Sequence, residues 1–186
     1  SHDTLDDRRG RGVRVQAACG DLVHQAIELS GSEHALDVLQ KAVRQHLAEP
    51  RHLRSAGADA LYSSPLKRAL TTAEAIASVT GLEIKVLDEL REMSYGGWEG
   101  RSFMEIRRND AEMYRRWSSD PAYRCPGGES HDDVLERMNR AVETVRGARR
   151  PVLVSHGTAI RVAATALLKV PVWTVRHLAQ DNASIN

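Results

Sequence analysis

Short runs of strand-forming residues alternate with helical segments along most of this chain, and this alternation restricts its fold more than any other feature. The expected strands lie at 13–20, 58–63, 83–87 and 152–155. The expected helices lie at 35–48, 65–81, 103–117, 130–145 and 157–168. Ser64 is expected to be the N-cap of the second helix, and Ser130 with Asp133 resembles a capping box at the start of the fourth. Strands joined through helices pair in parallel, and the helices then cover both faces of the sheet. The pattern predicts a three-layer α/β/α fold with a mostly parallel sheet.

Length and composition predict one domain in a reducing compartment. The polar stretch at 1–12 is expected to be a flexible arm, and 13–186 a single domain. A formal net charge of +1 gives no global reason to expect nucleic acid or a membrane surface as a partner. Cys19 and Cys125 form no CxxC pair, and no apolar run approaches the roughly 18 residues that span a bilayer. We expect a cytoplasmic protein without a metal site, and the oligomeric state stays open.

Three polar features lie at the ends of predicted strands, where ligands gather in parallel sheets. Arg68 is expected in the first turn of a helix that begins at Ser64 and Pro65, and its planar guanidinium can hold a phosphate by two hydrogen bonds. His156 leaves the most apolar strand at the start of the next helix, where helix amides also favour an anion. The structural alternatives are a solvated arginine and a histidine whose ring is satisfied by backbone groups.

A third motif places Glu92 before the glycine-rich turn that contains Gly96, Gly97 and Trp98. A glutamate beside apolar groups can have its pKa raised and can then donate a proton. The alternative is an ordinary charged loop.

Together these motifs resemble the histidine phosphatase superfamily, whose members have the phosphoglycerate-mutase-like fold. The resemblance rests on five motifs in the family's order: Ser63-Ser64-Pro65 with Arg68, Leu90-Arg91-Glu92, Pro126-Gly127-Gly128, Val154-Ser155-His156-Gly157 and Asp181-Asn182-Ala183. It implies that Arg68 clamps the phosphoryl oxygens and that His156 orients the phosphate. It also implies that Glu92 protonates the leaving alkoxide and later deprotonates the attacking water. No metal or other cofactor is expected, because cationic side chains stabilise the transferred group.

The family's first motif, a strand that ends in Arg-His-Gly with the nucleophilic histidine, does not occur in this sequence. In one alignment Ala18 replaces the arginine and Cys19 the histidine, while Gly20 and Gln25 contribute to phosphate binding. A thiolate can accept a phosphoryl group if its pKa is depressed. The other interpretation of Cys19 is a small buried thiol at the end of a strand.

A second alignment places the start of the chain after the nucleophile strand. Residues 3–18 then resemble the beginning of the family's first long helix, and an insertion precedes residue 58.

Three functions are compatible with these observations. The resemblance favours a metal-independent hydrolase of small phosphomonoesters, with an altered or lost nucleophile. A catalytically inactive relative would instead bind a phosphorylated or anionic ligand or a protein partner. A third hypothesis assigns acid–base chemistry on a non-phosphate substrate to Glu92 and His156. The segment 101–124 is expected to be a lid whose arginines favour an anionic substrate: Arg107, Arg108, Arg115, Arg116 and Arg124.

Overall fold

A computed structural model describes residues 57–178 and the backbone of residues 14–17. These residues form one sheet whose strands are β1 (Arg14–Ala17), β2 (Ala60–Ser63), β3 (Ile84–Val86) and β4 (Pro151–Ser155). The strand order is β1-β4-β2-β3, and every neighbouring pair is parallel. The predicted α/β fold with a parallel sheet is confirmed.

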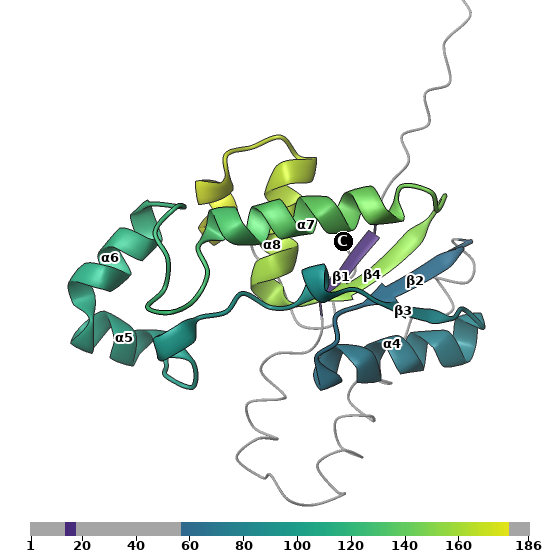
Figure 1. Cartoon of the computed structure of the whole chain (residues 1–186), viewed down its shortest axis with the longest axis horizontal. Coiled ribbons are helices and arrows are strands. Elements are labelled where there is room, and N and C mark those ends of the chain that lie inside the picture. The colour runs from purple at the N-terminus through teal and green to yellow at the C-terminus, as the bar shows by residue number, and fades with distance from the viewer. Residues whose placement is uncertain (1–13, 18–56, 179–186) are drawn as a thin grey trace, which may run out of the picture.

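Helices cover both faces of the sheet, as Figure 1 shows. α4 (Lys67–Thr80) lies on one face, and α7 (His131–Val145) and α8 (Gly157–Leu167) lie on the other. The side chains of β4 alternate between these layers, because successive residues of a strand point to opposite faces. Val152 packs in the apolar cluster under α4, whereas Leu153 packs in the larger cluster under α7 and α8.

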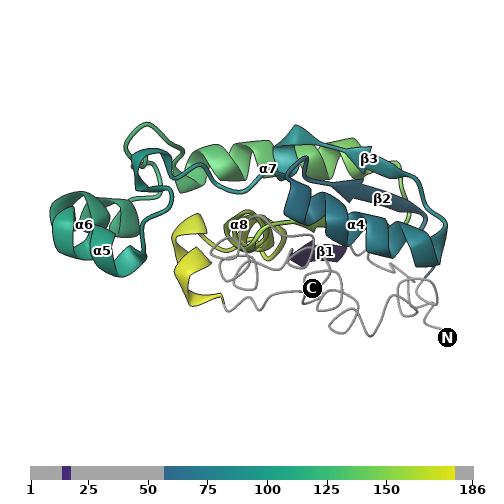
Figure 2. The ribbon, with the colours of Figure 1, turned by 90° about the horizontal axis from the view of Figure 1, so that it is seen from below.

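α5 (Phe103–Asn109) and α6 (Ala111–Ser119) extend beyond one end of the sheet (Figure 2). The prediction of a single helix at 103–117 was wrong, because the chain turns at Asp110, where φ is −125° and ψ is 40°. The carboxylate of Asp110 accepts hydrogen bonds from Trp98 Nε1 at 3.0 Å and from Arg101 Nη1 at 2.6 Å. These two contacts tie the joint between the helices to the preceding loop.

The starts of two helices test the capping predictions. The box formed by Ser130 and Asp133 is confirmed at the start of α7. α4 begins at Lys67, two residues later than Pro65, with Leu66 as its N-cap. The Ser64 hydroxyl accepts a hydrogen bond from the Leu66 amide at 3.3 Å and lies 2.8 Å from a ring nitrogen of His156. Ser64 therefore serves the site described below rather than the cap.

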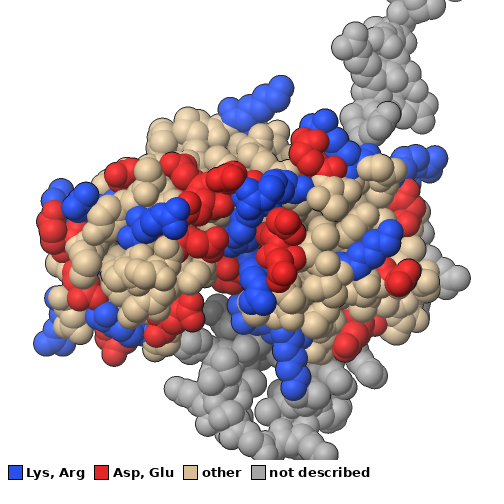
Figure 3. Space-filling view, in the orientation of Figure 1, with Lys and Arg blue, Asp and Glu red and all other residues tan. Residues whose placement is uncertain are grey.

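The described residues also contain three short 3₁₀ helices: η1 (Asp88–Leu90), η2 (Gly96–Trp98) and η3 (Val172–His177). Acidic and basic side chains intermingle over the face seen in Figure 3. Within the described ranges no helix is both long and apolar enough to cross a bilayer.

Several expectations fall outside the described residues, namely the arm at 1–12, the helix at 35–48 and the family's closing strand at 181–185. β1 bears on the two alignments of the first motif. Its residues Arg14–Ala17 form a strand that pairs with β4, as the first alignment predicts, and not the beginning of a helix, as the second requires.

Candidate active site

The carboxyl ends of β2 and β4 bring together side chains that are far apart in the sequence. Ser63 is the register partner of Val154, so Ser64 and His156 both follow strands that end at the same edge of the sheet. Arg68 Nε donates a hydrogen bond of 3.1 Å to His156 Nδ1, and His156 Nε2 lies 2.8 Å from the Ser64 hydroxyl oxygen. The arginine always carries its proton, so Nδ1 is the acceptor and Nε2 bears the ring hydrogen. His156 therefore donates to Ser64.

Burial keeps the His156 ring neutral. The residue is 2% exposed, and this burial, together with the neighbouring Arg68 guanidinium, lowers the pKa of His156 to about 3. The ring is satisfied by two side chains, Arg68 and Ser64, and not by backbone groups as the structural alternative supposed. Arg68 is likewise half-buried against His156 rather than solvated.

Glu92 lies against the first turn of α8, the helix that begins directly after His156. Its carboxylate accepts hydrogen bonds from the backbone amides of Thr158 at 3.3 Å and Ala159 at 3.2 Å, and from the Met93 amide at 2.8 Å. These three N–H donors fix the position of the carboxylate at the start of α8. Its direct partners are amides, where the sequence had suggested apolar groups. Arg68, His156 and Glu92 thus meet at one edge of the sheet.

A buried ion pair, which sequence reasoning missed, holds the Glu92 loop in place. Arg137 of α7 is paired with Glu129 by two hydrogen bonds of 2.8 and 3.1 Å. Its Nη1 also donates to the carbonyl oxygens of Glu89 and Arg91, each at 2.7 Å. Glu129 in turn accepts from the Ser94 amide at 2.8 Å. The pair fixes the backbone on both sides of Glu92.

Glycines allow this loop to contact the turn that precedes α7. Gly96 has φ of 55°, and a Cβ atom there would lie 2.2 Å from the carbonyl oxygen of Pro126. The Gly97 amide donates to that same oxygen at 2.7 Å. A Cβ on Gly128 would meet the Ser94 carbonyl oxygen at 2.4 Å. Only glycine fits at Gly96 and Gly128 with this backbone spacing.

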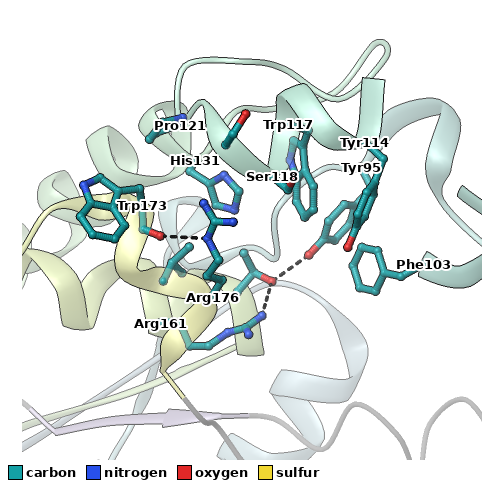
Figure 4. Close-up of a pocket in the computed structure, with 13 residues that line it drawn as sticks. Tyr95, Phe103, Tyr114, Trp117, Ser118, Pro121, His131, Arg161, Trp173 and Arg176 are labelled. Carbon is teal, nitrogen blue, oxygen red and sulfur yellow. Dashed lines mark hydrogen bonds between the residues drawn. The ribbon is translucent and has the colours of Figure 1, made fainter. Parts of the chain in front are cut away.

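A cavity of about 400 Å³ lies beside the site and is shown in Figure 4. Tyr95, Phe103, Tyr114 and Trp117 gather on one side, and Arg161, Arg176 and Trp173 lie on the other. Its lining residues are Tyr95, Phe103, Tyr114, Trp117, Ser118, Ser119, Pro121, His131, Thr158, Arg161, Trp173, Val175 and Arg176.

The cations of this cavity are not those that the sequence suggested. None of the five arginines expected in the lid lines it, and two of them pair with carboxylates: Arg115 with Glu112, and Arg124 with Asp133. Arg161 lies one helical turn after Gly157, and this spacing could have identified it.

Cys19, Gly20 and Gln25 lie outside the described residues. β1 ends at Ala17, whose register partner is Ser155, so this strand also ends at the edge where His156 lies. Over the described part of the chain, no group of three or more His, Cys, Asp or Glu residues is arranged to hold a metal ion.

The model of the histidine phosphatase superfamily (branch 1) matches residues 31–186, which is most of the chain. The protein belongs to the histidine phosphatase superfamily. The matched residues include Arg68, Glu92 and His156, but they begin after Cys19 and Gln25, so the match does not test the first motif.

Curated relatives agree with this assignment. Phosphoserine phosphatase 1 of Hydrogenobacter thermophilus is 34% identical over 158 residues, which cover 83% of this chain and 70% of that protein. The bifunctional protein Rv2228c of Mycobacterium tuberculosis is 38% identical over 137 residues. This alignment covers 72% of the chain but only 37% of the mycobacterial protein.

Solved structures share the fold. A mycobacterial glucosyl-3-phosphoglycerate phosphatase in complex with VO3 superimposes with a TM-score of 0.74 at 28% identity, covering 93% of this chain and 90% of that one. YhfR of Bacillus stearothermophilus has a TM-score of 0.71 at 23% identity. The phosphoserine phosphatase and the glucosyl-3-phosphoglycerate phosphatase support a phosphatase-like function, whereas YhfR shows the fold alone.

Proposed function

We propose that this protein binds small phosphomonoesters at Arg68 and His156 and hydrolyses them with Glu92 as the proton-transfer group. The observation that carries the proposal is the convergence of the three side chains, with Arg68 and His156 joined by a hydrogen bond and Glu92 held at the start of the helix after His156. A phosphoryl group bound here would meet a guanidinium and a neutral imidazole. The names of the relatives, which include two phosphatases of small phosphomonoesters, support the same class of reaction.

Glu92 would act in both halves of the reaction. The nucleophile attacks phosphorus, the bond from phosphorus to the ester oxygen breaks, and Glu92 gives its proton to that oxygen. A water molecule then attacks the phosphoryl group, Glu92 takes the proton from that water, and inorganic phosphate leaves. The amides of Thr158 and Ala159 hold the Glu92 side chain at the start of α8 in both halves of the reaction.

Ser64 is a poor candidate for the nucleophile, although it contacts His156. A serine is activated when the histidine accepts its proton. Here His156 Nδ1 accepts from Arg68, so Nε2 carries the ring hydrogen and cannot receive another. Ser64 is also fully buried.

The proposed nucleophile is therefore Cys19, two residues after the end of β1 in the sequence. Its thiolate would form a phosphorus–sulfur bond in the first half of the reaction and would be released in the second.

A second candidate function is binding of a phosphorylated or anionic ligand without hydrolysis. The observation that favours it is the absence of Arg-His-Gly from the sequence.

Hydrolysis of 4-nitrophenyl phosphate distinguishes the two functions. The proposal expects activity in the parent protein that disappears in Cys19→Ser. An inactive parent that gains activity in Ala18→Arg/Cys19→His would support the binding protein. Failure of the restored variant as well, with phosphate still bound, would show that the first alignment is wrong.

Binding of inorganic phosphate or vanadate tests the proposed phosphate site at Arg68 and His156 without requiring turnover. Arg68→Ala should weaken binding about tenfold or more, because a charged hydrogen-bond donor is removed. Lys67→Ala is the matched control, since Lys67 is the exposed neighbour of Arg68 and has the same charge. Equal affinities in the two variants would contradict the proposed clamp.

A further inference from the structure

We propose that the cavity beside the site binds the alcohol part of the substrate, and that this part combines a flat apolar face with a second anionic group, a carboxylate or a second phosphate. The inference rests on the proposed function and names the class of substrate for the same site. The cavity of about 400 Å³ has a volume typical of sites for small molecules, roughly 300–1,000 Å³.

Among the described residues that line the cavity, the charged side chains are all positive. Arg161 and Arg176 line it, and no Asp, Glu or Lys is present among the described residues of the lining. Neither arginine has a carboxylate within ion-pair distance in the described part of the chain. Within the described residues Arg161 donates to the Gly157 carbonyl and the Thr158 hydroxyl, and Arg176 to the Trp173 carbonyl. Two adjacent guanidiniums without a carboxylate partner among these residues attract an anion.

The other titratable groups of the lining do not compensate this charge. Burial, together with Arg161 and Arg176, lowers the pKa of His131 to about 4, so its ring is neutral at physiological pH. Burial raises the pKa of Tyr95 well above its usual value, so the phenol is neutral as well.

The opposite side of the cavity is a wall of packed aromatic rings. The ring of Trp117 is stacked on Phe103 with centroids 5.9 Å apart and on His131 with centroids 5.0 Å apart. Tyr95 and Tyr114 extend this cluster. Trp117 Nε1 is buried and has no hydrogen-bond partner among the described residues. Such a wall favours a ligand with a flat apolar face.

Thr158 connects this cavity to the catalytic groups. Its backbone amide holds Glu92, while its hydroxyl lies 2.7 Å from the Tyr95 hydroxyl and accepts from Arg161 at 3.2 Å. Arg161 is three residues further along α8, a rise of about 4.5 Å. A compact phosphomonoester can therefore place its ester oxygen near Glu92 and a second anion near Arg161.

Binding of phosphonates tests the inference without turnover. The probes are benzylphosphonate, in which CH₂ replaces the ester oxygen, and its 4-carboxy and 4-phosphonomethyl derivatives, which represent the two anionic groups. Titration can be followed by tryptophan fluorescence, because Trp117 and Trp173 line the cavity. We expect the parent to bind at least one doubly anionic probe about tenfold more tightly than benzylphosphonate, the effect of a charged hydrogen bond. The stronger of the two identifies the preferred anion.

In Arg161→Gln and Arg176→Gln the ratio of these affinities should fall below about three, because each variant removes one charged donor. Arg140→Gln is the matched control, because this exposed arginine of α7 pairs with Glu136 of the same helix and does not line the cavity. This variant should keep the parent ratio. Circular dichroism checks the folding of each variant. If Arg161→Gln does not fold, Arg176→Gln tests the inference by itself, because Arg176 is exposed.

A parent ratio near one, or a ratio that survives in both glutamine variants, would overturn the inference and leave the proposed function standing. If the parent binds neither inorganic phosphate nor benzylphosphonate, the proposed function itself fails.

Discussion

Replacement of Arg137 by Met should test how firmly the Glu92 loop is held. The substitution keeps most of the apolar stem and removes the guanidinium. It leaves the Glu129 carboxylate without its cation, and the carbonyl oxygens of Glu89 and Arg91 without their donor. These groups are near the surface but mostly covered, because the side chains of Arg137 and Glu129 are 10% and 24% exposed.

The size of the effect follows from this burial. Removal of one partner from a buried ion pair destabilises a protein by about 3–5 kcal/mol. Glu129 keeps its bond from the Ser94 amide and some contact with water, so we expect the lower end, about 3 kcal/mol. For a domain of this size, such a loss lowers Tm by roughly 6–12 °C.

Denaturant unfolding measures the loss, and hydrogen exchange locates it. The amides of Met93 and Ser94, which donate to Glu92 and Glu129, should lose protection first. Arg140→Met is the matched control on the same helix; its exposed pair with Glu136 should contribute less than about 1 kcal/mol. If Arg137→Met is no more destabilising than Arg140→Met, the pair does not stabilise the loop as argued.

Three further predictions concern other groups. Gly96→Ala should destabilise the fold by about 2 kcal/mol or more, because φ is 55° and the new Cβ would meet the Pro126 carbonyl oxygen at 2.2 Å. The control Gly97→Ala, whose new Cβ has its nearest contact at 3.5 Å, should change the free energy of unfolding by less than about 1 kcal/mol. Equal losses of the two variants in urea unfolding would be incompatible with this prediction. The folded pKa values of His156 (about 3) and His131 (about 4) lie below 6.5, so only the unfolded chain takes up these protons, and stability should fall as the pH drops from about 6.5 toward 3. His156→Gln should flatten this dependence, and an unchanged slope would refute the assignment. Burial raises the pKa of Cys125 to about 12, so its thiol should react with a disulfide reagent at pH 8 only after unfolding, and rapid labelling of that residue by mass spectrometry would contradict the structure.

The positions of Arg68, Glu92 and His156 could be predicted from the sequence. Each follows an apolar run whose period indicates a strand or the turn after it, and parallel strands end at a common edge. Local pattern therefore carried enough information to place these residues near one another. It also indicated the capping box at Ser130, because that signal lies within four residues.

Only the tertiary structure decided which side chains support and surround that set. Arg137 donates hydrogen bonds to carbonyl oxygens 46 and 48 residues away in the sequence. The Ser64 hydroxyl, expected to cap a helix, instead contacts the ring of His156, 92 residues away. Arg161 and Arg176 line the cavity, whereas none of the arginines expected at 101–124 to favour an anionic substrate does. Sequence periodicity shows which face of a helix is apolar, but it does not say which distant group will lie opposite a polar side chain. That choice depends on how the helices pack across the sheet, where a buried charge must find its partner.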